Sequence, residues 1–323
     1  MTWFLIAALI VAVVLLTAFY IYQTAFYSPK GKRADPFAPT DGEAYKAYRE
    51  NILRATKIMD QYSYEPVWIT SYDSKKLFAR YYHMDDDAPL EIICHGYRSS
   101  ALRDSSGGHA LSRRLKLNTL VIDQRAHGKS DGVTITFGVK ERYDCFSWIQ
   151  YANERFGRSK PIILSGLSMG AATVLMTADL PLPSNVQCII ADSPYSSPYR
   201  IIEKVCADLH YPRRLIKPFL LLSARLYGNF NLQESSAVEA VRQTTLPILL
   251  IHGEADDFVP AQMSQQIYAS NPERIQLHLF PGAGHGLACM TDPLRYRKIV
   301  WQFLKNIPAL QYHMDKIDEE SLL

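Results

Sequence analysis

The chain has 323 residues, 48% of them hydrophobic and 21% charged, with a formal net charge of +3. So small a charge, with Lys and Arg spread along the chain, excludes the basic profile of a nucleic-acid-binding protein. The cysteines are odd in number and have no CxxC spacing, so we expect neither a disulfide framework nor a zinc site. They are Cys94, Cys145, Cys188, Cys206 and Cys289.

An apolar run opens the chain, from Trp3 to Tyr22, with Thr17 as its one interruption. About twenty apolar residues are enough to cross a bilayer as a helix. A cleaved signal peptide is the alternative, but no Lys or Arg precedes the run and no A-x-A site follows it. We therefore predict a retained transmembrane anchor over residues 1–27.

The residues at the end of this run are typical of a membrane boundary. Three basic residues follow it, so the positive-inside rule predicts a single-pass protein whose following domain is cytoplasmic; they are Lys30, Lys32 and Arg33. Aromatic residues gather at the same boundary, as in the aromatic belts of membrane proteins; they are Tyr20, Tyr22, Phe26 and Tyr27.

Residues 28–63 are predicted to be a linker followed by a helix. Pro, Gly and charged residues dominate up to residue 40. Acidic residues suited to a helix start open the segment 41–62, where apolar residues recur at helical spacing. Residues 65–71 and 77–83 then alternate around the turn 72–75, which indicates an antiparallel hairpin.

The remainder alternates between short apolar runs and helical segments. The predicted buried strands are residues 91–94, 119–123, 161–165, 186–191, 247–251 and 275–280. The predicted helices are residues 107–115, 139–156, 169–178, 261–270 and 293–306. This alternation predicts an α/β domain over residues 64–323, with a mostly parallel sheet and helices on both faces. Residues 193–245 contain no predicted strand and are expected to form a helical cap.

The sequence Gly166-Leu167-Ser168-Met169-Gly170 joins a predicted strand to a predicted helix. A strand, a turn with glycine on both sides of one serine, and a helix make up the pattern of a nucleophile elbow. The tight turn leaves no room for side chains at its flanks and exposes the serine hydroxyl at the positive end of the helix. Ser168 is therefore predicted to be the nucleophile of a serine hydrolase.

A serine nucleophile needs a base to take its proton and an acid to orient that base. After a nucleophile elbow, the acid and then the histidine follow in the chain. Asp256 lies in the loop after the strand 247–251, and His285 lies in the loop after the strand 275–280. Both loops leave the carboxyl ends of strands, where sites form in open α/β sheets. We predict His285 as the base and Asp256 as the acid, with neighbouring Asp257 as the alternative.

Four separated motifs stand in one order along the chain: His95-Gly96-Tyr97, the elbow, the run His252-Gly253-x-x-Asp256-x-x-Val259-Pro260, and Gly284-His285-Gly286. A further run from Asp123 to Ser130 has the form D-x-R-x-H-G-x-S. With these motifs, residues 64–307 resemble the α/β-hydrolase superfamily, in its bacterial serine-aminopeptidase-like and lysophospholipase-like branch. The resemblance implies the α/β-hydrolase fold with a helical cap insertion.

The resemblance also implies an oxyanion hole made of two backbone N–H groups. One belongs to Met169, directly after the nucleophile. The other, by resemblance alone, belongs to Tyr97. His95, His127 and His252 each precede a glycine just after a strand and are interpreted as braces of loops. Asp123 and Arg125 are interpreted in the same way.

The leading hypothesis is a membrane-anchored serine hydrolase that cleaves carboxylic esters through an acyl-enzyme, without a metal or an organic cofactor. Its expected partners are a small-molecule or lipid-like ester and the membrane, and the sequence specifies no oligomeric state. An aminopeptidase-like serine peptidase is the alternative, with Glu203 and Asp208 as candidates for binding a substrate amine. Thioesterase and acyltransferase activities are further alternatives, whereas the complete triad disfavours a non-enzymatic binding protein.

The cap raises a separate question, because residues 211–222 mix basic and bulky apolar side chains. Such a segment either packs its apolar face on the domain or dips toward the membrane as a lid that admits acyl chains.

Overall fold

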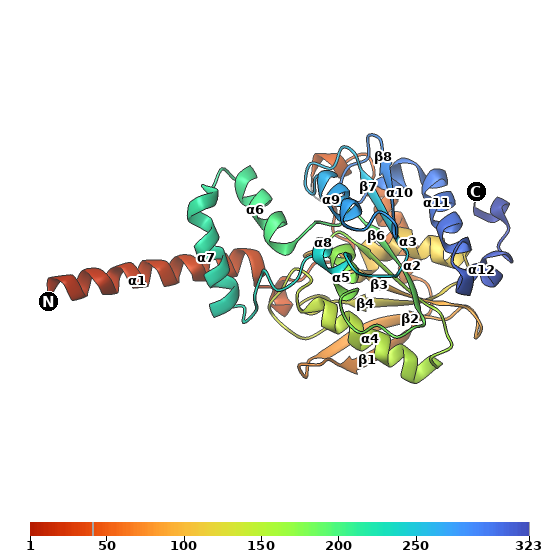
Figure 1. Cartoon of the computed structure of the whole chain (residues 1–323), viewed down its shortest axis with the longest axis horizontal. Coiled ribbons are helices and arrows are strands. Elements are labelled where there is room, and N and C mark those ends of the chain that lie inside the picture. The colour runs from red at the N-terminus through yellow and green to blue at the C-terminus, as the bar shows by residue number, and fades with distance from the viewer. Residues whose placement is uncertain (41, 323) are drawn as a thin grey trace.

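The computed structural model describes residues 1–40 and 42–322, without the side chains of residues 213–215, 321 and 322. These residues form one sheet of eight strands in the order β1-β2-β4-β3-β5-β6-β7-β8 (Figure 1). β2 pairs antiparallel with β1 and with β4, and all other pairs are parallel. The strands are β1 (Glu65–Thr70), β2 (Lys76–Tyr82), β3 (Leu90–Cys94), β4 (Asn118–Asp123), β5 (Ile162–Leu167), β6 (Val186–Asp192), β7 (Ile248–Gly253) and β8 (Ile275–Phe280).

Helices cover both faces of this sheet, which confirms the predicted α/β-hydrolase fold. One face carries α4 (Glu141–Phe156), α5 (Met169–Thr177), α8 (Ala237–Ala240) and α9 (Gln262–Ser270). The other face carries α3 (Ala101–Arg114), α10 (Ala288–Thr291), α11 (Pro293–Lys305) and α12 (Pro308–Met314), and α2 (Arg49–Asp60) packs on α3. The strands β3, β4 and β7 are buried along their whole length, because both of their faces are covered.

Between β6 and β7 the described residues form helices and no strand. α6 (Pro198–Asp208) and α7 (Arg213–Leu226) stand beside the sheet domain, as Figure 1 shows. α7 buries Leu220 and Ala224 in a cluster that also contains residues of α5 and α6. The apolar face of the predicted cap segment therefore packs on the protein, while the side chains of Arg213 and Arg214 lie outside the described residues.

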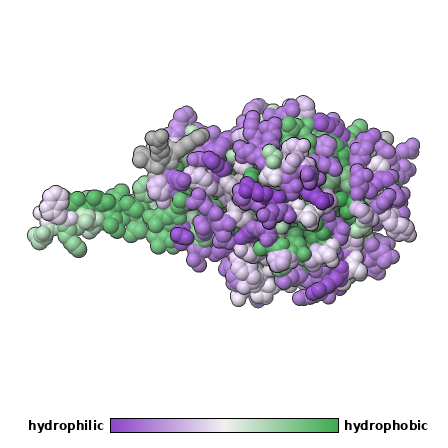
Figure 2. Space-filling view, in the orientation of Figure 1, coloured by the Kyte–Doolittle hydropathy of each residue, from purple (hydrophilic) through white to green (hydrophobic). Residues whose placement is uncertain are grey.

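α1 (Thr2–Ile21) projects from the domain as an apolar rod, in contrast to the mostly hydrophilic surface of the rest (Figures 1 and 2). Among the described residues, one helix, Thr2–Phe26, is long and apolar enough to cross a membrane. α7 lies against the C-terminal half of α1.

The chain enters the domain directly after α1, which corrects the prediction of an aromatic belt at Tyr22 and Phe26. A π-helical turn, Tyr22–Phe26, buries both side chains. The ring of Phe26 is fully buried and contacts the rings of Phe137 and Phe230, with centroids 5.8 and 5.3 Å away. The fold thus uses these aromatic side chains as core.

Two predicted helices differ in their bounds. The segment 41–62 forms a short 3₁₀ turn, Glu43–Tyr45, before α2 begins at Arg49, and its predicted first residue, Asp41, lies outside the described residues. α3 begins at Ala101, six residues before the predicted start, because Ser100 caps it by accepting a hydrogen bond from the Arg103 N–H.

Candidate active site

Ser168 occupies the turn between β5 and α5 in a conformation that is strained for a residue with a side chain, with φ 56° and ψ −116°. The neighbouring backbone leaves no space beside it. A Cβ on Gly166 would lie 2.4 Å from the carbonyl of Gly170, and a Cβ on Gly170 would lie 2.1 Å from the carbonyl oxygen of Cys94. The two glycines therefore allow the turn to fold tightly against β3 and hold the Ser168 hydroxyl above the sheet.

Three loops at the carboxyl edge of the sheet bring Ser168, His285 and Asp256 into one hydrogen-bonded chain. Ser168 Oγ lies 2.8 Å from His285 Nε2, and His285 Nδ1 lies 2.7 Å from Asp256 Oδ2. The serine follows β5, the aspartate follows β7 and the histidine follows β8. Side chains predicted from separate motifs thus meet in the geometry that nucleophilic catalysis requires.

The Asp256 carboxylate is buried and fully engaged. Its Oδ1 accepts the backbone N–H groups of Phe258 and Val259 at 3.1 and 2.8 Å, and its Oδ2 lies 3.2 Å from His252 Nε2. Burial by itself raises the pKa of this carboxyl, but the hydrogen bonds from His252 and His285 outweigh it and bring the pKa to about 2. The carboxylate is therefore ionised at neutral pH, as the partner of an imidazolium must be.

Asp257, the alternative acid, makes no hydrogen bond with His285 in the part of the chain that the structure describes. It is exposed, and its backbone carbonyl accepts a hydrogen bond from the Lys204 ammonium group. The structure thus brings Asp256, and not Asp257, into contact with His285.

The loop after β3 carries the predicted oxyanion residue Tyr97 and is held in place by α3. The Gly96 N–H donates to Asp104 Oδ2 at 2.8 Å. The Tyr97 side chain turns away from Ser168, donating its hydroxyl to the Ala25 carbonyl at 2.8 Å. On the other side of the serine, the Met169 N–H belongs to the first turn of α5, where backbone N–H groups have no partner within the helix.

The three motif histidines brace loops, as predicted. His95 Nε2 accepts the Gln124 N–H at 3.1 Å, and His127 Nε2 accepts the Arg98 N–H at 3.0 Å. His252 lies between Ser264 Oγ at 2.6 Å and the Val259 carbonyl at 2.8 Å, which holds the loop that carries Asp256.

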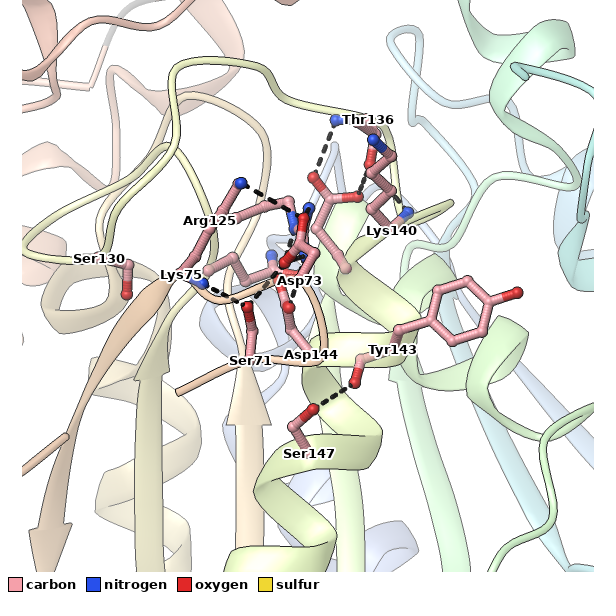
Figure 3. Close-up of polar contacts among 12 residues, drawn as sticks. Ser71, Asp73, Lys75, Arg125, Ser130, Thr136, Lys140, Tyr143, Asp144 and Ser147 are labelled. Carbon is pink, nitrogen blue, oxygen red and sulfur yellow. Dashed lines mark hydrogen bonds and ion pairs between the residues drawn. The ribbon is translucent and has the colours of Figure 1, made fainter. Parts of the chain in front are cut away.

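Arg125 is likewise a buried brace and does not line the cavity at Ser168. Figure 3 shows its guanidinium between two carboxylates. It donates two hydrogen bonds to Asp144, each 2.6 Å long, and two to Asp73, at 3.1 and 3.2 Å. These bonds tie the loop after β4 to α4 and to the β1–β2 turn. Asp123 has a similar role, since its Oδ2 accepts the Lys129 N–H at 2.8 Å.

Two residues near the site have no counterpart among the predicted ones. The Tyr45 hydroxyl donates to the His285 carbonyl at 2.9 Å, and the ring of Phe258 lies edge-on to the His285 imidazole, 5.1 Å between centroids. Phe258 stands two positions after the predicted acid, which is a signal for it in the sequence, whereas no pattern marks Tyr45.

A cavity of about 640 Å³ opens at Ser168 and His285. Residues of the N-terminal segment cover it, among them Pro39, Gly42 and Tyr45. A cavity of this size suits a small organic ligand.

The sheet has the strand order of the α/β-hydrolase superfamily. A serine at a strand-to-helix turn is hydrogen-bonded to a histidine from a later loop, and this histidine is hydrogen-bonded to an aspartate. Together these features define a hydrolase of that superfamily. The chain belongs to the prolyl oligopeptidase family (Peptidase_S9), whose family model matches residues 131–309, more than half of its length.

Similarity to individual proteins extends over about two thirds of the chain or more. The chain is 25% identical over 307 residues to the uncharacterized protein YqkD of Bacillus subtilis (strain 168), covering 94% of this chain and 96% of YqkD. It is 26% identical over 236 residues to protein ABHD12B of Homo sapiens, covering 65% of this chain and 59% of that protein. Among solved structures, the Pyrococcus furiosus esterase Pf2001 superposes with a TM-score of 0.62 at 25% identity, covering 78% of this chain and 93% of that one.

Proposed function

We propose that this protein is a membrane-anchored serine hydrolase that cleaves carboxylic esters, with Ser168, His285 and Asp256 as its catalytic triad. The observation that carries the proposal is the continuous hydrogen-bonded chain from Ser168 Oγ through His285 to Asp256 at the mouth of the cavity. No metal or organic cofactor takes part in this chemistry.

The geometry supports the following reaction. His285 Nε2 takes the proton of Ser168 as Oγ attacks the ester carbonyl, and Asp256 stabilises the imidazolium that forms. The N–H groups of Tyr97 and Met169 bind the oxyanion of the tetrahedral intermediate. His285 then protonates the leaving alcohol, which gives an acyl-enzyme, and the same histidine activates the water that releases the acid.

The two acids considered for binding a substrate amine, Glu203 and Asp208, are not placed to do so at this cavity. An aminopeptidase needs an available carboxylate to bind a substrate amine. Glu203 accepts hydrogen bonds from Tyr199 and Arg200, and Asp208 pairs with Lys204, so both candidate acids are engaged. Neither lines the cavity. Pf2001, a structural neighbour, is also described as an esterase.

We also propose that α1 remains in the protein as a single membrane span, with the hydrolase domain on the cytoplasmic side. The Tyr227 hydroxyl donates to the Leu15 carbonyl at 3.1 Å. The thirteen residues from Thr2 to Val14 that precede this contact reach about 20 Å at 1.5 Å per residue. The hydrocarbon core is about 30 Å thick. A spanning α1 therefore places its contact with α7 inside the bilayer, so the end of α7, where Leu226 is 52% exposed, would also enter the membrane.

The test is a substrate panel on the full-length protein, with p-nitrophenyl esters beside aminoacyl anilides. We expect ester turnover that Ser168→Ala removes, and labelling of the native protein by a fluorophosphonate probe. Turnover of anilides at rates above those of esters would replace the esterase proposal with the peptidase alternative.

A further inference from the structure

The cavity at Ser168 continues far beneath α3, along one face of the sheet. Its lining includes Gly96 and Leu167 at the carboxyl ends of β3 and β5, and also Glu91 and Leu117 at the amino ends of β3 and β4. Strands rise ~3.3 Å per residue, so the five steps from Glu91 to Gly96 span about 16 Å. We name this cavity the α3 tunnel.

The far end of the α3 tunnel is closed and apolar. Leu115, Leu117 and Leu304 line it there, and each is only 1% exposed. The wall between this end and Ser168 carries further apolar side chains; they are Leu111, Ile190 and Val300. The end of the tunnel away from Ser168 is therefore lined by buried apolar side chains.

The tunnel also contains two buried carboxyl groups, which are satisfied from within the protein. Glu91 accepts a hydrogen bond from Ser112 Oγ at 2.5 Å, and Asp192 accepts one from Ser193 Oγ at 2.9 Å. Burial raises the pKa of both carboxyls. Each is thereby held toward its uncharged form, so these groups do not exclude an apolar ligand.

The inner face of α3 gives the tunnel its width. Ser105, Gly108 and Ser112 recur at helical spacing and all line the cavity. Glycine in the middle of a helix lowers the stability of the helix, so the presence of Gly108 needs a physical reason. A Cβ on Gly108 would meet no atom within 4 Å, and the backbone there does not require glycine. Ser105 Oγ is buried without a hydrogen-bond partner. These small residues leave space within the cavity that Ser168 also lines.

We propose that the α3 tunnel binds the acyl chain of the ester, as an unbranched chain of up to about twelve carbons. The length follows from the 16 Å span, since a zigzag chain with bonds of about 1.5 Å advances about 1.3 Å per carbon. This inference rests on the proposed ester hydrolysis and names its substrate class, esters of medium-chain fatty acids.

The order of the reaction assigns the tunnel to the acid part of the ester. The alcohol must leave before water can attack, whereas the acyl group stays bonded to Ser168 Oγ until that step. A tunnel closed at its far end is suited to the part that stays. The alcohol then departs toward the side covered by residues 39, 40 and 42–45.

The experiment measures kcat/KM for p-nitrophenyl esters from acetyl to hexadecanoyl, with full-length protein in one detergent at one concentration. Each buried methylene is expected to raise kcat/KM about fourfold. The values should rise to an optimum between eight and about twelve carbons and then fall. In Gly108→Leu, the ratio of the dodecanoyl to the acetyl value should drop about sixty-fold, the loss of some three methylenes. Gly108→Ala should give a smaller drop in a variant that folds readily.

The matched control is Ala110→Leu, which adds the same side chain to the exposed face of α3 and should leave the whole profile unchanged. Binding of dodecanoate to Ser168→Ala protein, followed by calorimetry, gives a readout that needs no turnover; Gly108→Leu in that background should weaken it. A flat chain-length profile, or no dodecanoate binding, overturns the tunnel even if Ser168-dependent ester cleavage is found. Dodecanoate binding without ester cleavage instead overturns the proposed function and keeps the tunnel as a fatty-acid site.

Discussion

Replacing Asp256 with asparagine should remove most of the turnover and leave the fold in place. Oδ1 accepts the N–H groups of Phe258 and Val259, and the amide oxygen of asparagine can accept the same bonds. The amide nitrogen then takes the place of Oδ2, 2.7 Å from His285 Nδ1. Because an amide nitrogen only donates, the imidazole must carry its proton on Nε2, facing Ser168, where it cannot accept the serine proton.

We expect kcat to fall on the order of 10⁴-fold, or about 5 kcal/mol of activation free energy. The free energy of unfolding should change by less than this activation free energy. The pKa of the Asp256 carboxyl lies at about 2 instead of 3.8, so its ionised form contributes about 2 kcal/mol to folding. Since this pKa is lower in the folded than in the unfolded chain, the contribution is complete above about pH 4 and is lost as the pH falls toward 2.

The assay is the initial rate on p-nitrophenyl butyrate, with thermal unfolding of each variant as the check on the fold. Asp257→Asn is the matched control, because that side chain is exposed and makes no contact with His285; its kcat should stay within about twofold of the native value. The reasoning is refuted if folded Asp256→Asn protein keeps more than about a tenth of its kcat, or if Asp257→Asn loses as much.

Three further predictions concern the support of the site. Arg125→Met should lower the free energy of unfolding by about 3–5 kcal/mol, because it leaves two carboxylates without their buried partner. Arg155→Met removes a more exposed ion pair and should lower it by less than about 1 kcal/mol. Urea unfolding measures both changes. Burial lowers the pKa of His109 from 6.5 to about 4. As the pH falls from 6.5 to 4, the unfolded chain takes up the proton and the folded chain does not, so the free energy of unfolding should decrease by about 1.4 kcal/mol per pH unit. His109→Gln should remove that part of the slope, and an unchanged slope would contradict the assignment. Gly170→Ala should abolish activity together with the native near-ultraviolet spectrum, because its Cβ would meet the Cys94 carbonyl oxygen at 2.1 Å; an active, folded variant would be inconsistent with the elbow.

The sheet and the meeting of Ser168, His285 and Asp256 could be anticipated from the sequence, because each residue lies in the turn or loop that follows a short apolar run. In a parallel sheet the carboxyl ends of such strands share one edge, so the order of the motifs was enough to bring the side chains together. Competition between Asp256 and Asp257 could not be decided in this way. It depends on which carboxylate the backbone N–H groups of the loop hold toward His285.

Long-range contacts and the start of α3 were beyond the sequence. Tyr45 reaches His285 across 240 positions of the chain, and no local pattern marks such a contact. Phe26 follows an apolar helix and has the composition of a membrane boundary, yet the domain buries it. α3 begins in a stretch of serine and glycine with low helix propensity, and packing against α2 and the sheet stabilises it there.

The central claim is that Ser168 is an activated nucleophile, and covalent labelling tests it most directly. Full-length protein is treated with a fluorophosphonate probe, and the modified peptide is identified by mass spectrometry, in parallel with Ser168→Ala protein whose fold is checked by thermal unfolding. We expect one modified residue, Ser168, no labelling of the variant, and the loss of ester turnover in step with labelling. Unlabelled native protein that still hydrolyses esters, or a folded Ser168→Ala variant that retains turnover, would contradict the account.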